Sequence, residues 1–145
     1  MAASDLELVS RAQAFLTEDM KRVIDDPAVQ EPMQELVDPE AEVRFHAPDG
    51  GVLGDRQVPE HGVEGLREGW RDWMQAWEQF WIRFGEMIDL GEGRVLSFGE
   101  LSGRLPGGAE LTQPGAALIA VRDGKIVSLD FYVDQDQARR DAGVG

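Results

Sequence analysis

The chain has 145 residues, with 28 acidic side chains against 14 basic ones and a formal net charge of −14, which favours a single acidic domain over residues 1–145. Nucleic acids and anionic membranes are bound by clustered Lys and Arg, so this charge argues against both kinds of partner. Cysteine is absent, which excludes disulfides, thiolate catalysis and cysteine-ligated metals and fits the cytoplasm. The first residues lack the pattern of a signal peptide, and no apolar run reaches the roughly 18 residues of a membrane helix.

Helical periodicity dominates the first half of the chain. Apolar residues recur every three or four positions from about Asp5 to Ile24, which predicts a first helix. Proline is favourable at a first helical position, so a second, short helix is expected from about Pro27 to Val37. A short strand from Glu42 to His46 and a long loop from Ala47 to Gly62 should follow. A third helix is then predicted by an apolar face made of Val63, Leu66, Trp70, Trp73, Met74 and Trp77.

From Phe80 onward the apolar period changes to two, which predicts β-strands. Asp123-Gly124 is a strong hairpin signal, and Pro114 indicates a bulge or a sheet edge. Helices followed by a long meander predict an α+β fold whose bent strands enclose a pocket. The expected strands are 80–90, 95–104, 110–121 and 126–134, and a closing helical turn over 135–142 should end at Gly143.

Several short motifs stand out along this pattern, namely Asp38–Val43, His61–Arg67, Ile88–Gly91, Val121–Val127, Tyr132–Asp134, Ala138 and Ala142-Gly143. Together they resemble the SnoaL-like branch of the nuclear transport factor 2-like superfamily, over nearly the whole chain except residues 47–60. The resemblance implies a cone, in which helices pack on a strongly curved, mostly antiparallel sheet around an apolar pocket. It also implies a homodimer formed through the sheet.

Enzymes of this superfamily, which include polyketide cyclases, ketosteroid isomerases and limonene epoxide hydrolases, carry carboxylates inside the cone. A carboxyl group in an apolar pocket has a raised pKa and can transfer a proton near neutral pH. Resemblance to the epoxide hydrolases places Glu100 at an acid position, Phe98 at an arginine position and Phe131 at a second acid position. A slip of one residue would turn Asp130 inward instead of Phe131. The simpler alternative is that Glu100 is an ordinary surface glutamate.

Two histidines complete the set of candidate acids and bases. His46 ends the first predicted strand, where it could act at the pocket mouth or only hydrogen-bond at its rim. The candidate catalytic residues are therefore Glu100, with His46 or Asp130 assisting. His61 more simply caps or packs at the start of the third helix. The spacing of His, Asp and Glu fits no metal motif, so we predict neither a metal nor a cofactor.

Aromatic residues are abundant enough to build either a core or a ligand pocket. Resemblance to ketosteroid isomerases adds Gln13, which falls near the position of a first-helix tyrosine. The leading hypothesis is a protein that encloses a small apolar molecule and catalyses proton transfer, such as isomerisation, cyclisation or dehydration, with a buried carboxylate. The alternative is a non-catalytic ligand-binding or dimeric accessory protein. The expected pocket residues are Gln13, Phe15, Trp70, Trp73, Trp77, Phe84, Phe98 and Phe131.

Overall fold

The computed structural model of the chain describes residues 2–14, 20–23, 26–46, 56–73 and 77–144. Helices predominate in the first half and strands in the second, as the change of apolar period predicts. Within the described residues, the elements are α1 (Ala2–Ala14), α2 (Met20–Val23), α3 (Pro27–Leu36), β1 (Val37–His46), β2 (Arg56–His61), α4 (Gly62–Trp73), β3 (Gln79–Gly91), β4 (Arg94–Arg104), β5 (Glu110–Arg122), β6 (Lys125–Tyr132) and α5 (Gln135–Ala142).

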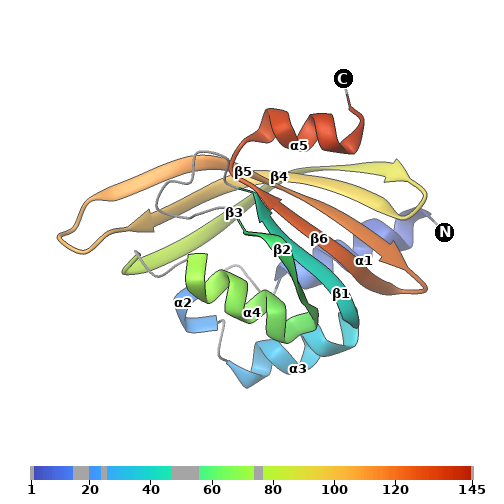
Figure 1. Cartoon of the computed structure of the whole chain (residues 1–145), viewed down its shortest axis with the longest axis horizontal. Coiled ribbons are helices and arrows are strands. Elements are labelled where there is room, and N and C mark those ends of the chain that lie inside the picture. Colours follow the sequence, from blue (N-terminus) through green and yellow to red (C-terminus); the bar gives the residue numbers. More distant parts are fainter. Residues whose placement is uncertain (1, 15–19, 24–25, 47–55, 74–76, 145) are drawn as a thin grey trace.

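The strands form a single six-stranded sheet in the order β2-β1-β6-β5-β4-β3. Every neighbouring pair is antiparallel except β1 and β6, which run parallel. Helices α1 to α4 lie on one face of the sheet, called here the inner face, and α5 lies on the opposite, outer face (Figure 1). The α+β class with a mostly antiparallel sheet is thus confirmed.

Local turn chemistry explains the meander. Glu92 and Gly93 between β3 and β4, and Asp123 and Gly124 between β5 and β6, all have positive φ angles. Two positive φ angles in a two-residue loop match the right-handed twist of the flanking strands. Pro114 pairs with Glu100 of β4 but lies beyond the last residue of β5 that pairs with β6, so the predicted sheet edge is confirmed there.

One prediction about the first half of the chain is wrong. The expected long loop contains β2, which pairs with β1 at the edge of the sheet, where Pro59 is tolerated because one side of the strand needs no partner. The expected first helix is helical over its described residues, as α1 (Ala2–Ala14) and α2 (Met20–Val23), and residues 15–19 between them lie outside the described residues. The short helix is confirmed as α3, and the strand after it begins earlier, at Val37.

Apolar residues pack on both faces of the sheet. On the inner face, Trp70 of α4 and Phe45 of β1 are almost completely buried. The two elements approach closely because Gly69 has no side chain: a Cβ there would lie 2.2 Å from Cε2 of Phe45. On the outer face, Leu96, Phe98 and Tyr132 are buried together with Ala138 and Ala142 of α5.

Helix α5 is held in place by local and distant contacts. The Asp134 side chain accepts hydrogen bonds from the backbone N–H groups of Asp136 and Gln137, which is the pattern of an N-cap. Gly143, in the left-handed region with φ of 79°, ends the helix as predicted. The Gln135 side chain also donates to the carbonyl oxygens of Gly99 and Gly115, so α5 is anchored to the middle of the sheet.

Candidate functional site

A small cavity lies on the inner face of the sheet, beside α4. Its volume is about 40 Å³, close to that of one water molecule. Helix α4 and strands β3, β4, β5 and β6 all contribute to its wall. The lining residues are Trp70, Ile82, Phe84, Ser97, Phe98, Gly99, Gly115, Ala116, Ala117 and Phe131.

Interlocking aromatic rings fill most of the space around this cavity. The ring of Phe131 stacks on that of Phe45, with centroids 5.1 Å apart, and meets Trp70 edge-on at 4.9 Å. Trp70 also contacts Phe45 edge-on at 5.6 Å. These are favourable aromatic geometries, so the rings stabilise one another and keep the cavity small.

The structure places the expected pocket residues in three groups. Trp70, Phe84, Phe98 and Phe131 line the cavity, although the ring of Phe98 also lies 4.6 Å below the guanidinium of Arg139 in α5. Trp77 is buried against Phe80 and does not line the cavity. Phe15 and the side chain of Trp73 lie outside the described residues.

One polar pair reaches the cavity wall. Ser97 of β4 is buried, with 4% of its surface exposed, and lies among the lining residues. Its Oγ accepts a hydrogen bond of 2.8 Å from Nε2 of Gln13, which projects from α1. Gln13, an expected pocket residue, is not among the lining residues and reaches the cavity wall only through its bond to Ser97, a residue that carries no recognisable sequence signal.

The prediction that Glu100 is buried inside the cone is wrong. Glu100 is exposed, and its neighbour Leu101 belongs to the inner apolar cluster instead. The inward residues of β4 are those in step with Leu101, including Ser97 and Gly99, so the predicted register of this strand was off by one residue. On β6 the predicted register holds, because Phe131 packs against the inner cluster.

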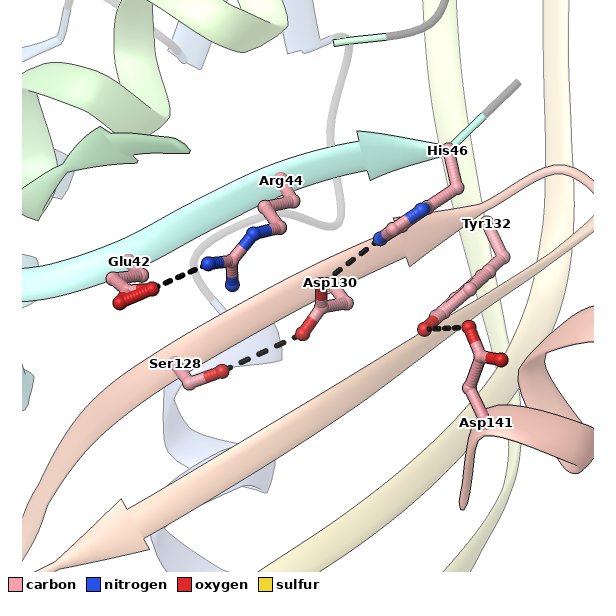
Figure 2. Close-up of polar contacts among 7 residues, drawn as sticks. All are labelled: Glu42, Arg44, His46, Ser128, Asp130, Tyr132 and Asp141. Carbon is pink, nitrogen blue, oxygen red and sulfur yellow. Dashed lines mark hydrogen bonds and ion pairs between the residues drawn. The ribbon is translucent and has the colours of Figure 1, made fainter. Parts of the chain in front are cut away.

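The outer face of the sheet carries a polar cluster, drawn in Figure 2, that includes two of the candidate catalytic residues. His46 Nε2 lies 2.9 Å from Asp130 Oδ1, and the two side chains are only 14% and 16% exposed. Ser128 donates a hydrogen bond of 3.4 Å to the other oxygen of Asp130. His46 and Asp130 meet because β1 and β6 are parallel neighbours, and both lie on the face opposite the cavity.

Tyr132 joins this cluster to α5. Its ring stacks on the His46 ring, with centroids 4.5 Å apart, and its hydroxyl donates a hydrogen bond of 2.9 Å to Asp141. Burial, the bond to Asp141 and the negative charges of Asp130 and Asp141 raise the pKa of Tyr132 well above its usual value. Tyr132 therefore remains a protonated hydrogen-bond donor. On β1, Arg44 lies opposite Asp130 and forms an ion pair of 2.5 Å with Glu42.

Three further sequence-based expectations concern metal ligands, His61 and membrane-spanning helices. Within the part of the chain that the structure describes, no three His, Asp or Glu side chains converge as metal ligands would. His61 is exposed and ends β2, directly before α4. None of the described helices is long and apolar enough to cross a membrane.

Comparison with known proteins places this geometry in a family. The model of the SnoaL-like domain matches residues 25–129. No curated protein matches significantly. Among solved structures, TerC, co-crystallised with polyporic acid, has a TM-score of 0.70 at 18% identity, covering 97% of this chain and 98% of TerC.

Two further structures share the fold. An NTF2-like protein of unknown function from Burkholderia pseudomallei K96243 has a TM-score of 0.68 at 13% identity, over 94% of this chain and 95% of that protein. IdmH from Streptomyces antibioticus, described as a candidate polyketide cyclase, has a TM-score of 0.62 at 17% identity, over 93% of this chain and 98% of IdmH.

Proposed function

The chain belongs to the SnoaL-like domain family, and from this premise we propose that it binds a small, uncharged, apolar ring compound in the cavity beside Trp70 and Phe131. The composition of the cavity wall carries the proposal. Aromatic and small apolar residues form it, and among the described lining residues none is ionisable. A charged ligand would lose its hydration there without gaining a partner, whereas an apolar one gains by leaving water.

Entry of a ring-sized ligand requires the cavity to expand. The present volume of about 40 Å³ accommodates a single water molecule, whereas an apolar cavity of roughly 150 Å³ is known to bind benzene. Ile82 and Phe84 lie on the edge strand β3, and the β3–β4 register shifts just after Phe84. An edge strand with an irregular ladder opens at lower cost than a central strand, so we propose that the ligand enters beside β3.

Proton transfer by a carboxylate in the cavity is not part of this proposal. Glu100 is exposed and Asp130 belongs to the outer polar cluster, so neither lies in the described wall. The non-catalytic, ligand-binding alternative is therefore the function that the geometry supports best. IdmH, described as a candidate polyketide cyclase, and TerC, co-crystallised with polyporic acid, support a small organic molecule as the kind of ligand.

A fluorescence titration tests this function. A neutral probe such as N-phenyl-1-naphthylamine should bind the protein and quench the emission of the buried Trp70. Ala117→Leu places a larger side chain in the cavity wall and should weaken binding at least tenfold, the scale of roughly 1.4 kcal/mol. Ala109→Leu, the same substitution on an exposed turn, is the control and should bind as the wild type does. Equal binding by both variants would place the probe elsewhere.

We also propose that two copies associate through the outer face of the sheet. Half-buried apolar residues, among them Ile88, Leu90 and Leu118, border the outer apolar cluster there. An apolar patch next to polar residues is typical of a protein interface. Sedimentation velocity should give twice the chain mass, and Leu118→Lys should give the single mass. Sedimentation of the wild type as a monomer at about 100 µM would contradict the proposed dimer. The free energy of association would then be weaker than roughly 5.5 kcal/mol.

A further inference from the structure

Ser97 is the one feature of the cavity that an apolar container does not need. Aromatic side chains such as Tyr132 apart, it is the only buried polar side chain among the described residues, and its surroundings on the inner face include Val95, Leu101 and Trp70. Burying a hydroxyl group costs free energy unless it is hydrogen-bonded, so alanine or valine would serve packing better. A polar residue at this position therefore calls for an explanation beyond stability.

The hydrogen-bond inventory of the pair shows what remains available. Oγ of Ser97 accepts from Nε2 of Gln13 at 2.8 Å, so the hydroxyl hydrogen of Ser97 is directed elsewhere. Ser97 donates no hydrogen bond to any of the residues that the structure describes. Ser97 lines the cavity, so an acceptor carried by a ligand is the partner that the site lacks.

The amide of Gln13 prepares the hydroxyl for this role. Because it occupies a lone pair of Oγ, it restricts the rotation of the hydroxyl and polarises its O–H bond. Gln13 comes from α1 and Ser97 from β4, 84 positions apart, so the pair is set by the tertiary fold and not by local turn chemistry. Together they form one fixed donor in an otherwise apolar wall.

We propose that Ser97, positioned by Gln13, is the specificity-determining residue of the cavity and selects an uncharged ring compound that carries a carbonyl oxygen. The ring lies among Trp70, Phe84 and Phe131, and the carbonyl oxygen accepts a hydrogen bond from the Ser97 hydroxyl. This inference rests on the proposed function of the same cavity. It adds a chemical requirement that shape and hydrophobicity alone would not impose.

Two probes of nearly equal shape test the role of Ser97 separately from the binding of apolar molecules in the cavity. 2-Acetylnaphthalene carries a carbonyl oxygen where 2-isopropenylnaphthalene carries a methylene group. The wild type should bind the ketone roughly fivefold more tightly, the scale of one neutral hydrogen bond. Ser97→Ala should abolish this preference by weakening only the ketone, and Gln13→Met should reduce it. Ser102→Ala, which removes an exposed hydroxyl from the same strand, should preserve it.

The outcomes are distinguishable. If both probes bind equally to the wild type and to Ser97→Ala, the cavity binds apolar molecules but Ser97 does not select them, and the inference is overturned alone. If neither probe binds, the proposed function fails together with the inference. A loss of binding for both probes in Ser97→Ala, with a lower melting temperature, would make Ser97 merely structural and would also overturn the inference.

Discussion

The contact between α4 and β1 gives a sharp prediction for Gly69→Ala. A Cβ at this position would lie 2.2 Å from Cε2 and 2.8 Å from Cζ of Phe45, whereas ordinary contacts begin near 3.4 Å. Phe45 is completely buried and packs against Phe131 and Trp70, so a movement of its ring disturbs those contacts. The helix or the ring must therefore shift by roughly 1 Å, and overpacking of this kind costs about 1–3 kcal/mol.

Helix propensity opposes this cost, because alanine is favoured over glycine inside a helix by up to about 1 kcal/mol. The net expectation for Gly69→Ala is a loss of about 1–2 kcal/mol. For a chain of this size, that corresponds to a melting temperature lower by about 3–6 °C. Differential scanning calorimetry measures this shift directly.

Two further variants isolate the steric cause. Glu68→Ala changes an exposed position of the same helix and should alter stability by no more than about 0.5 kcal/mol. Phe45→Leu removes the ring edge that the new methyl group meets, so the double variant with Gly69→Ala should be less destabilised than the two single variants predict together, by about 1 kcal/mol. A melting temperature of Gly69→Ala equal to or above that of the wild type would refute the reasoning.

Three other predictions concern the outer face and α5. The folded-state pKa of Tyr132 is raised, so the stability linked to its protonation is complete below about pH 10 and falls as the pH rises further. Tyr132→Phe should make this decline in stability less steep in urea unfolding between about pH 8 and pH 11. Parallel stability curves for the variant and the wild type would contradict the prediction. A double-mutant cycle of His46→Ala and Asp130→Ala should give a coupling of about 0.5–3 kcal/mol at pH 7, whereas additive losses would show that the 2.9 Å contact contributes nothing. Asp134→Ala removes the N-cap of α5 and should lower the free energy of unfolding by about 1 kcal/mol in chemical denaturation. Asp123→Ala should affect stability only through the turn that contains Asp123.

Local chemistry determines the features of the fold that can be predicted correctly from the sequence. The turn at Asp123-Gly124, the helix that ends at Gly143 and the edge position of Pro114 follow from backbone preferences of a few neighbouring residues. The burial of Trp70 against the sheet follows from helical spacing. These features need no knowledge of distant partners, so they can be predicted from a single sequence.

The errors occur where partners far apart in the chain decide. Residues 95–98 of β4 are all buried, because helices cover one face of this strand and α5 covers the other. Without alternation between buried and exposed positions, the sequence does not reveal which side chains point inward, and Glu100 was assigned to the wrong face. The contact of His46 with Asp130 was unforeseen for a similar reason, since the parallel pairing that creates it spans 84 positions.

The parallel pairing of β1 with β6 also affects how the chain folds during its synthesis. During synthesis, β1 emerges from the ribosome long before β6 is made. One edge of β1 therefore lacks its native pairing partner while the intervening strands are still being synthesised. Contacts of such long range close late and slow the search for the native state. Newly made chains should therefore depend on chaperones until the last strand has been released, and truncation before Lys125 should leave an aggregating fragment.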